Sequence, residues 1–288
     1  DILLKYKPSH VLAISDAWHW EYQTRSPLRK YFSHVVMPAV DAIPQNKQWV
    51  DMYVSADAVL GYTQWGCDVI KQADNRANVV GPASPWACKD YVEHPNKKQL
   101  QSSLGLGDVK IVGMVARNQP RKAFPNLFKS FAEFLEKSKR KDIYLYIHSS
   151  YPDRCYEFDE ELNKYGIGHR TLFTYICPKC SHVEPSFFDG MMRQCGKCGG
   201  TQTFPSVGMA ITSQQMSLVY NLIDLYVQHA SLEGYGIPIM EAAACGVPVV
   251  AVDYSAMSEV AKLCGGDVIE PKGYTQEAET GRQFAVPN

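Results

Sequence analysis

The chain has 288 residues, which is enough for two domains that each bury a core of their own. Hydrophobic residues make up 45% of the chain and charged residues 20%, as in an ordinary soluble globular protein. The formal net charge of −1 argues against a nucleic-acid or polyanion binder. No apolar run reaches the roughly 18 residues needed to span a bilayer, and no signal peptide opens the chain. Because the first residue is Asp1 rather than Met, we expect a fragment of a longer protein.

Short β-type runs alternate with helical stretches along the chain, which predicts an α/β protein with parallel sheets. We expect a first domain over residues 1–93. Residues 93–98 are polar and interrupted by Pro95, so they are the expected linker. In the first domain, strands are expected at residues 11–15, 35–37, 58–62 and 78–80, and helices at 49–56 and 65–72.

A second α/β domain is expected over residues 94–288. In the helix expected at 125–138, apolar residues recur at the 3.6-residue spacing of a helix that buries one face. The other expected elements of this domain are strands at 110–115, 143–147, 172–174, 224–227 and 247–252, and a helix at 214–222.

A glycine-containing turn between a strand and a helix gives the strongest chemical signal in the chain. The strand ends near Gln228, and Glu-Gly-Tyr-Gly at 233–236 leads into a helix with Pro238 near its first position, where proline is favoured. Glycines there let the backbone approach a ligand, and the free N–H groups and the helix dipole favour an anion such as a diphosphate. A plain β–α turn would explain the two glycines alone.

Two carboxylates bracket this turn, because seven residues separate Glu233 from Glu241. One carboxylate near a helix N-terminus is often a simple dipole contact. Two of them around a glycine turn suggest recognition of hydroxyl groups, as on a ribose and a sugar ring. The helix then continues through small residues at 242–245 and is stopped by Gly246, so it can pack closely on the sheet.

The stretch 233–242, with 244–251 behind it, resembles the donor-site motif of family 4 glycosyltransferases, which have the GT-B fold. Residues 220–227 resemble the strand entry that precedes this motif in the family. Residues 115–122 resemble the basic turn after the first strand of the family's C-terminal domain. The resemblance covers most of residues 50–270 outside a cysteine-rich insert. It implies two Rossmann-like domains whose parallel sheets face a cleft.

The resemblance further implies a retaining transfer of a sugar from a nucleotide-diphosphate sugar to an acceptor, without a catalytic metal. Arg117 and Lys122 would hold the donor diphosphate and stabilise leaving-group charge, with Arg121 an alternative to either. Any one of these cations alone could be a solvated surface charge, whereas three in one turn favour a site. Glu233 would face the transferred sugar, and Glu241 would bind the ribose. The phosphate or the sugar would contact the backbone N–H groups of Gly234, Tyr235, Gly236 and Ile237.

Residues 1–93 resemble the later part of the family's acceptor-side domain, so we expect this domain to be truncated. Family members often place a His or an Asp at the ends of its strands, which makes Asp16, His19 and Asp41 the acceptor-side candidates. Helix capping or a turn is the alternative explanation for each of them, and it is the slightly favoured one. The family's opening glycine-rich loop and its C-terminal crossing helix are not found in the sequence.

Four of the nine cysteines form two C-x-x-C pairs, Cys177 with Cys180 and Cys195 with Cys198, with fourteen residues between the pairs. This spacing predicts a zinc ribbon over residues 175–205, inserted in the second domain, in which four thiolates hold a structural zinc ion. Two disulfides, four free thiols or an iron–sulfur site are the alternatives. The odd number of remaining cysteines favours a reducing, cytoplasmic location.

The expected partners are the nucleotide sugar and a carbohydrate, lipid or protein acceptor. No nucleic acid is expected, and peripheral contact with a membrane stays open. One alternative function is a GT-B enzyme of another reaction type, such as an epimerase or a phosphorylase. Another is a zinc-ribbon binding module on an inactive transferase scaffold. The basic face of that module would come from Lys179, His182, Arg193 and Lys197, diluted by Glu184 and Asp189.

Overall fold

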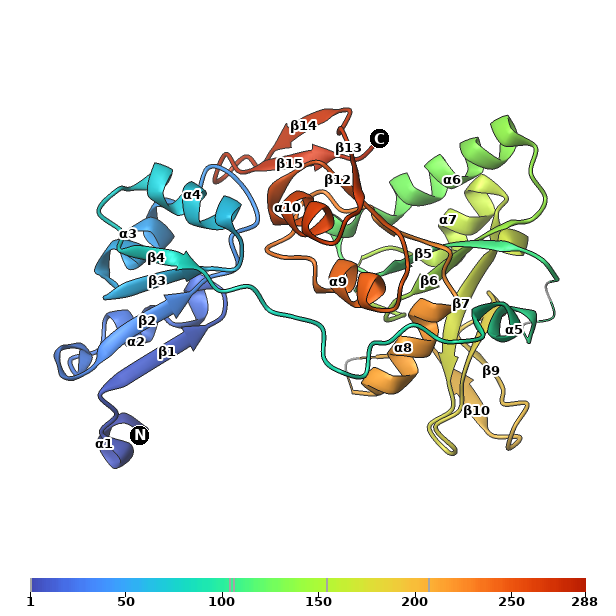
Figure 1. The fold of residues 1–288 in the computed structure, drawn as a ribbon, viewed down its shortest axis with the longest axis horizontal. Coiled ribbons are helices and arrows are strands. Elements are labelled where there is room, and N and C mark those ends of the chain that lie inside the picture. The colour runs from blue at the N-terminus through green and yellow to red at the C-terminus, as the bar shows by residue number, and fades with distance from the viewer. Residues whose placement is uncertain (1, 104, 106, 154, 207) are drawn as a thin grey trace.

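The computed structural model describes residues 2–288 except 104, 106, 154 and 207. Figure 1 shows two α/β units side by side, the first coloured blue to cyan and the second green to red, joined by one extended segment. Within the described part of the chain, no helix combines the length and the apolar character that crossing a membrane requires.

The first unit contains a four-stranded, all-parallel sheet in the order β1-β2-β3-β4. Helices connect β2 to β3 and β3 to β4, because parallel neighbours need a crossover between them. Buried residues such as Trp20, Val36 and Tyr53 form its core. Its elements are α1 Ile2–Tyr6, β1 His10–Ile14, α2 Glu21–Thr24, β2 Ser33–Met37, α3 Lys47–Ser55, β3 Ala58–Gly61, α4 Gln64–Ala73 and β4 Val79–Pro82.

The second unit contains a nine-stranded sheet. Six strands are parallel, in the order β13-β12-β11-β5-β6-β7. From β5 the chain moves outward to β6 and β7, and from β11 it moves outward to β12 and β13. The sheet therefore has a topological switch point between β5 and β11, where ligands bind outside the carboxyl ends of the strands. These strands are β5 Lys110–Val115, β6 Ile143–His148, β7 Thr171–Ile176, β11 Leu225–Gln228, β12 Val249–Val252 and β13 Asp267–Ile269.

Helices pack around this sheet in two apolar clusters. The helix expected at 125–138 is confirmed as α6, and it buries Phe124, Leu127 and Phe128 together with Phe158 of α7. The other cluster includes Ile239 and residues of the neighbouring helices. The helices are α5 Lys97–Ser102, α6 Phe124–Ser138, α7 Phe158–Tyr165, α8 Ser213–Asn221, α9 Ile237–Ala244 and α10 Ser255–Leu263.

The cysteine-rich insert extends the main sheet rather than forming a detached module. Strand β8 (Val183–Phe187) pairs antiparallel with β7 along its whole length. Strand β10 (Thr201–Thr203) also pairs with β7, and β9 (Met192–Gln194) pairs with β10. The insert is therefore anchored to the second unit through backbone hydrogen bonds.

The chain between the units, residues 83–96, forms neither helix nor strand and includes turns at 89–90 and 95–96, so the expected linker at 93–98 covers only its end and the start of α5. This segment lies against α8. The Asn221 amide oxygen accepts a hydrogen bond from His94 N at 2.7 Å, and its nitrogen donates to Val92 O at 2.9 Å. The polar face of α8 thereby fixes the segment onto the second unit.

Two further contacts join the units. The Glu259 carboxylate on α10 accepts hydrogen bonds from the backbone N–H groups of Gln64 and Trp65 in the first turn of α4, at 2.9 and 2.7 Å. A hairpin of β14 (Gly273–Gln276) and β15 (Gln283–Val286) reaches from α10 toward the first unit (Figure 1). Its Gln283 N–H donates to Ile43 O at 2.7 Å.

Candidate functional site

Two turns meet at the switch point of the second sheet. One follows β5 and contains Arg121 and Lys122, and the other follows β11 and contains Glu233. Ser231 N in the second turn donates to Arg121 O in the first, at 2.7 Å. The basic turn and the glycine turn that the sequence singled out are thus in direct contact.

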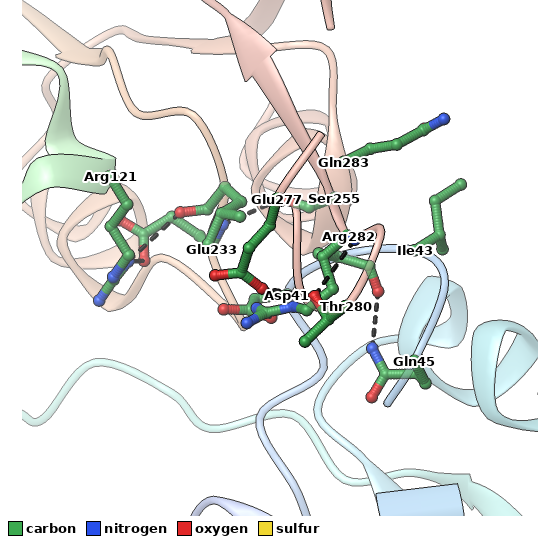
Figure 2. A network of polar contacts seen from close by, with 12 residues as sticks. Asp41, Ile43, Gln45, Arg121, Glu233, Ser255, Glu277, Thr280, Arg282 and Gln283 are labelled. Atoms are coloured by element: carbon green, nitrogen blue, oxygen red, sulfur yellow. Dashed lines mark hydrogen bonds and ion pairs between the residues drawn. The ribbon is translucent and has the colours of Figure 1, made fainter. Parts of the chain in front are cut away.

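Glu233 is the centre of this site, and only 6% of its surface is exposed. Its Oε2 accepts a hydrogen bond from Arg121 Nη1 at 2.6 Å. Its Oε1 accepts from Gln228 Nε2 at 2.6 Å and pairs with Lys122 Nζ. Its backbone N–H donates to Ser255 Oγ at 3.0 Å. Figure 2 shows Arg121 and Ser255 approaching Glu233 from opposite sides.

Two cations surround this one carboxylate. Burial alone would raise the pKa of Glu233, but Lys122 and Arg121 outweigh burial and hold that pKa below its usual range. Glu233 therefore stays ionised at neutral pH. Burial lowers the pKa of Lys122, and Glu233 opposes that shift. Two basic side chains around one carboxylate suit the binding of an anion.

A cavity of about 580 Å³ opens beside the cluster. Its walls include the turn after β5, the end of β6 and the start of α9. Arg117 lies on its wall and pairs with Asp153 at 2.8 Å, with half of the arginine side chain exposed. The three cationic residues named from the sequence therefore line one cavity: Arg117, Arg121 and Lys122.

Glu241 occupies a different position from Glu233. It lies in α9 and accepts a hydrogen bond from the Tyr220 hydroxyl of α8 at 2.7 Å. The described walls of the cavity include Pro238 from the start of α9 but not Glu241. The two glutamates of the motif thus flank the beginning of α9 instead of sharing one pocket.

The glycine turn itself packs against the first unit. A Cβ atom on Gly234 would lie 2.8 Å from Ala39 Cβ, so the close approach of the two units requires glycine at this position. Gly236 has a φ of +92° and ends the turn where α9 begins with Ile237, which is half exposed. The Tyr235 hydroxyl donates to Pro85 O at 2.8 Å, so this side chain points to the connecting segment.

The acceptor-side candidates lie at the cleft-facing strand ends of the first unit. Asp41, after β2, accepts a hydrogen bond from Arg282 Nη2 of the hairpin at 2.6 Å (Figure 2). Burial raises the pKa of Asp16, and His19, Arg121 and Arg282 are close enough to oppose the shift. His19 is exposed beside Trp18. The structure therefore brings Asp16 and Asp41 to the side of the cleft opposite the Glu233 cluster.

Comparisons with known proteins identify a sequence family for part of the second unit and a fold for most of the chain. Residues 207–280 match the sequence model of the family described as glycosyl transferases group 1. No curated protein sequence matches the chain. In fold, the chain is similar to sucrose-phosphate synthase from Thermosynechococcus elongatus, with a TM-score of 0.65 and 15% identity over 94% of this chain and 63% of that one.

Similar values relate the chain to Anabaena HepE, solved with UDP and glucose, with a TM-score of 0.65 and 16% identity over 94% of this chain and 66% of that one. For S. aureus TarM, solved with UDP and carbohydrate ligands, the TM-score is 0.61 and the identity 15% over 91% of this chain and 45% of that one. The chain therefore spans less than two thirds of the length of these structures. The fold is GT-B. The fold predicted from the motifs is thereby confirmed.

Several residues of this GT-B cleft were not recognised in the sequence. Gln228 and His148 each close a buried strand with a polar side chain, and that signal was available. His148 bonds to Thr174 Oγ1 through Nδ1 at 2.9 Å, and burial lowers its pKa to about 4. The role of Ser255 depends on a φ of +55° for a non-glycine residue, and that of Arg282 on a distant hairpin. Neither of these features can be read from residue types.

The four cysteines of the insert converge on one point. Their sulfur atoms all lie within 4.8 Å of one another, with 3.6 Å between Cys177 and Cys198 and 3.7 Å between Cys180 and Cys195. Each C-x-x-C pair closes a similar turn, in which Ser181 N donates to Cys177 O and Gly199 N to Cys195 O. A tetrahedral ion with Zn–S bonds of about 2.3 Å would separate its sulfurs by about 3.8 Å, so these residues fit zinc.

One side chain links this cysteine cluster to the GT-B cleft. Gln215 of α8 donates from Nε2 to Ser181 O at 2.9 Å, while its Oε1 accepts from Thr212 N at 2.9 Å in the capping box of the helix. The same helix contributes Met216 to the cavity wall and Tyr220 to Glu241. The cluster therefore braces the helix that supports the expected donor site.

Proposed function

We propose that this chain belongs to a retaining, family 4 glycosyltransferase that transfers a sugar from a nucleotide-diphosphate sugar to an acceptor. The observation that carries the proposal is the cluster of Arg121, Lys122 and Glu233 at the switch point of the second sheet, beside a cavity of about 580 Å³. The match of residues 207–280 to group 1 glycosyltransferases supports it, as do the UDP complexes of HepE and TarM.

Binding of the donor would rearrange the charges of this cluster. The donor diphosphate would take up hydrogen bonds from Arg121 and Lys122, with Arg117 at the cavity wall as the third cation. The oxygens of Glu233 would then be free to accept hydrogen bonds from hydroxyls of the transferred sugar. The same cations would stabilise the negative charge that develops on the departing diphosphate.

The proposed contacts to the ribose and to the phosphate or sugar come from residues around the start of α9. Glu241 would accept hydrogen bonds from the ribose, with its carboxylate oriented by the Tyr220 hydroxyl. The backbone of residues 234–237 would meet the phosphate or the sugar at the start of α9. In a same-face displacement, the departing diphosphate helps to accept the proton of the acceptor hydroxyl, and the sugar keeps its anomeric configuration.

A thermal-shift screen with UDP-, GDP- and ADP-sugars tests donor binding. A donor present at 100 times its Kd stabilises the fold by about 2.7 kcal/mol, which raises the Tm measurably. UDP-sugars are the first to test, because HepE and TarM were solved with UDP. Absence of a shift with every nucleotide, together with salt-sensitive binding of RNA or DNA, would favour the alternative of a binding module on an inactive scaffold.

The stereochemistry needs its own experiment. Proton NMR of the released or transferred sugar at early times reports its anomeric configuration. We expect the same anomer as in the donor. The opposite anomer would exclude retention while leaving donor binding intact.

We further propose that Cys177, Cys180, Cys195 and Cys198 bind one zinc ion, because their sulfur separations and paired turns fit a tetrahedral site. Four protein ligands leave no coordination position open, so the ion would stabilise the insert and take no part in the transfer. The cytoplasmic location remains a proposal that rests on the cysteine pattern of the sequence.

A further inference from the structure

A large aromatic side chain stands exposed at the cleft edge of the first unit. Trp18 follows β1 in a short 3-10 helix, two residues after Asp16, and 52% of its surface is exposed. Exposed tryptophan is unusual, because burial of this side chain removes a large apolar surface from water. Its surroundings show how the ring is held in this position.

Trp18 is the outer member of an aromatic cluster built from three elements. Its ring lies 5.3 Å from that of Trp49 on α3. The Arg282 guanidinium lies 5.3 Å from the Trp49 ring on one side and 5.9 Å from the Phe284 ring on the other. The ion pair between Arg282 and Asp41 holds the cation in place. A ring supported in this way loses little conformational entropy when a ligand packs on it.

Carboxylates accompany this aromatic surface. Asp16 follows β1 and is partly buried. Asp41 lies in the loop that follows the neighbouring strand β2. Arg282 balances the charge of Asp41, so Asp16 adds a negative charge on this side of the cleft, and that charge disfavours an acceptor whose reacting end carries a phosphate or a carboxylate.

A sugar ring matches the combination of a flat apolar surface and hydrogen-bond acceptors. The C–H groups on one face of a pyranose are apolar and pack on an aromatic ring. Its hydroxyls must keep their hydrogen bonds when water is removed, and a carboxylate accepts such bonds. Arg282 connects the rings of Trp18 and Trp49 to Asp41, and Figure 2 shows Asp41 on the side that faces Glu233, so a ring on Trp18 would lie beside the cleft.

We propose that the acceptor is itself a carbohydrate, whose sugar ring packs on Trp18 while its hydroxyls bond to Asp16. This inference rests on the proposed transferase function. The sequence allowed a carbohydrate, a lipid or a protein as acceptor, and this inference favours the carbohydrate.

Saturation-transfer NMR on the whole chain tests the proposal without turnover. The probes are maltose, cellobiose and lactose, each added with UDP. Wild-type protein should transfer saturation to the C–H protons of one ring of at least one disaccharide. Trp18→Ala should weaken this transfer about fivefold, and Trp18→Phe should retain part of it.

Tyr31→Ala is the matched control, because Tyr31 is 68% exposed in the same unit but precedes β2, at the end of the sheet opposite the cleft. It should behave as the wild type does. UDP signals report folding and donor binding in every sample.

The outcomes separate the two proposals. Loss of the UDP signals in the wild type would contradict the proposed function. Retained UDP signals would overturn the carbohydrate assignment if no disaccharide receives saturation, or if Trp18→Ala leaves that saturation unchanged.

Discussion

The two sides of the cleft differ in how deeply their charged side chains are buried. In the second unit, Glu233 and Lys122 are 6% and 7% exposed and hydrogen-bonded to each other. In the first unit, Asp16 is only partly buried, and Trp18 is half exposed. A diphosphate has the same charge and shape in every donor, so fixed, buried charges suit it. The first unit instead presents the exposed Trp18 ring, on which we propose that a sugar packs. Substitutions on this side should therefore cost little stability.

Substitution of the central carboxylate should have the largest effect. Glu233→Ala leaves Lys122 buried without its counter-charge, and we expect a loss of about 3 to 5 kcal/mol in the free energy of unfolding. Urea denaturation measures it. A loss below about 1 kcal/mol would show that the cluster is less buried in solution than the structure indicates.

Metal loss should damage the second unit selectively. Cys177→Ser should remove the ion and destabilise the protein by about 2 to 4 kcal/mol, because one ligand of four is lost. Metal analysis and thermal unfolding measure the two effects. Zinc that remained at one ion per chain in this variant would refute the ribbon assignment.

A fall in pH should destabilise the second unit and favour the first. The pKa of His148 is about 4 in the fold and its usual value is 6.5, so its contribution to stability is present above pH 6.5 and is lost as the pH falls toward 4. We expect a loss of about 1 to 3 kcal/mol over this range. Burial raises the pKa of Asp16 and Asp41, so their protonation opposes the loss.

Thermal unfolding of the wild type and of His148→Gln between pH 7 and pH 4.5 checks this sign. The variant should lose less stability on acidification than the wild type. Equal pH profiles would show that His148 is not held neutral by burial.

The link from the cysteine cluster to the donor site should have a smaller effect. Gln215→Glu keeps the oxygen of the capping box and loses the donor to Ser181 O. We expect the Kd for UDP to rise about fivefold, because α8 supports Glu241 through Tyr220. Gln214→Glu adds the same charge one residue away and loses a hydrogen bond to Asp90 in the connecting segment instead of the bond to Ser181, so it should leave the Kd unchanged, as calorimetry can show. Equal Kd values for both variants would mean that the cluster does not act on the donor site.

The smallest effect is expected at Asp16, the proposed acceptor-side carboxylate. Asp16→Ala should change the free energy of unfolding by no more than about 0.5 kcal/mol, since burial already opposes its charge. The same urea experiment as for Glu233→Ala measures it. Comparable losses in both variants would remove the contrast between the two sides.

The sequence predicted the four strands of the first sheet and five of the six parallel strands of the second, because each contains an apolar run between polar turns. It did not predict β13 or the insert strands β8, β9 and β10. It also brought Arg121, Lys122 and Glu233 to one site, because both turns follow strands that ligand-binding α/β sheets place at one edge. It did not predict the hairpin β14–β15, whose first strand is mostly exposed and polar. The bond of Arg282 to Asp41 joins residues far apart in the chain, and no local pattern encodes it.

The sequence also left open how the site charges are paired. The sequence assigned the diphosphate to Arg117 and Lys122 and left Arg121 as an alternative to either. The structure separates them, because Arg117 pairs with Asp153 at the surface whereas Arg121 and Lys122 bind Glu233. Burial decides this difference, and burial depends on the packing of the whole unit.

Hydrogen–deuterium exchange with and without UDP tests most directly whether the switch point of the second sheet binds the donor. We predict that UDP slows exchange in residues 116–123 and 231–241 and leaves residues 10–20 unchanged. Protection confined to the cysteine insert at 177–198, or no protection at all, would contradict the account.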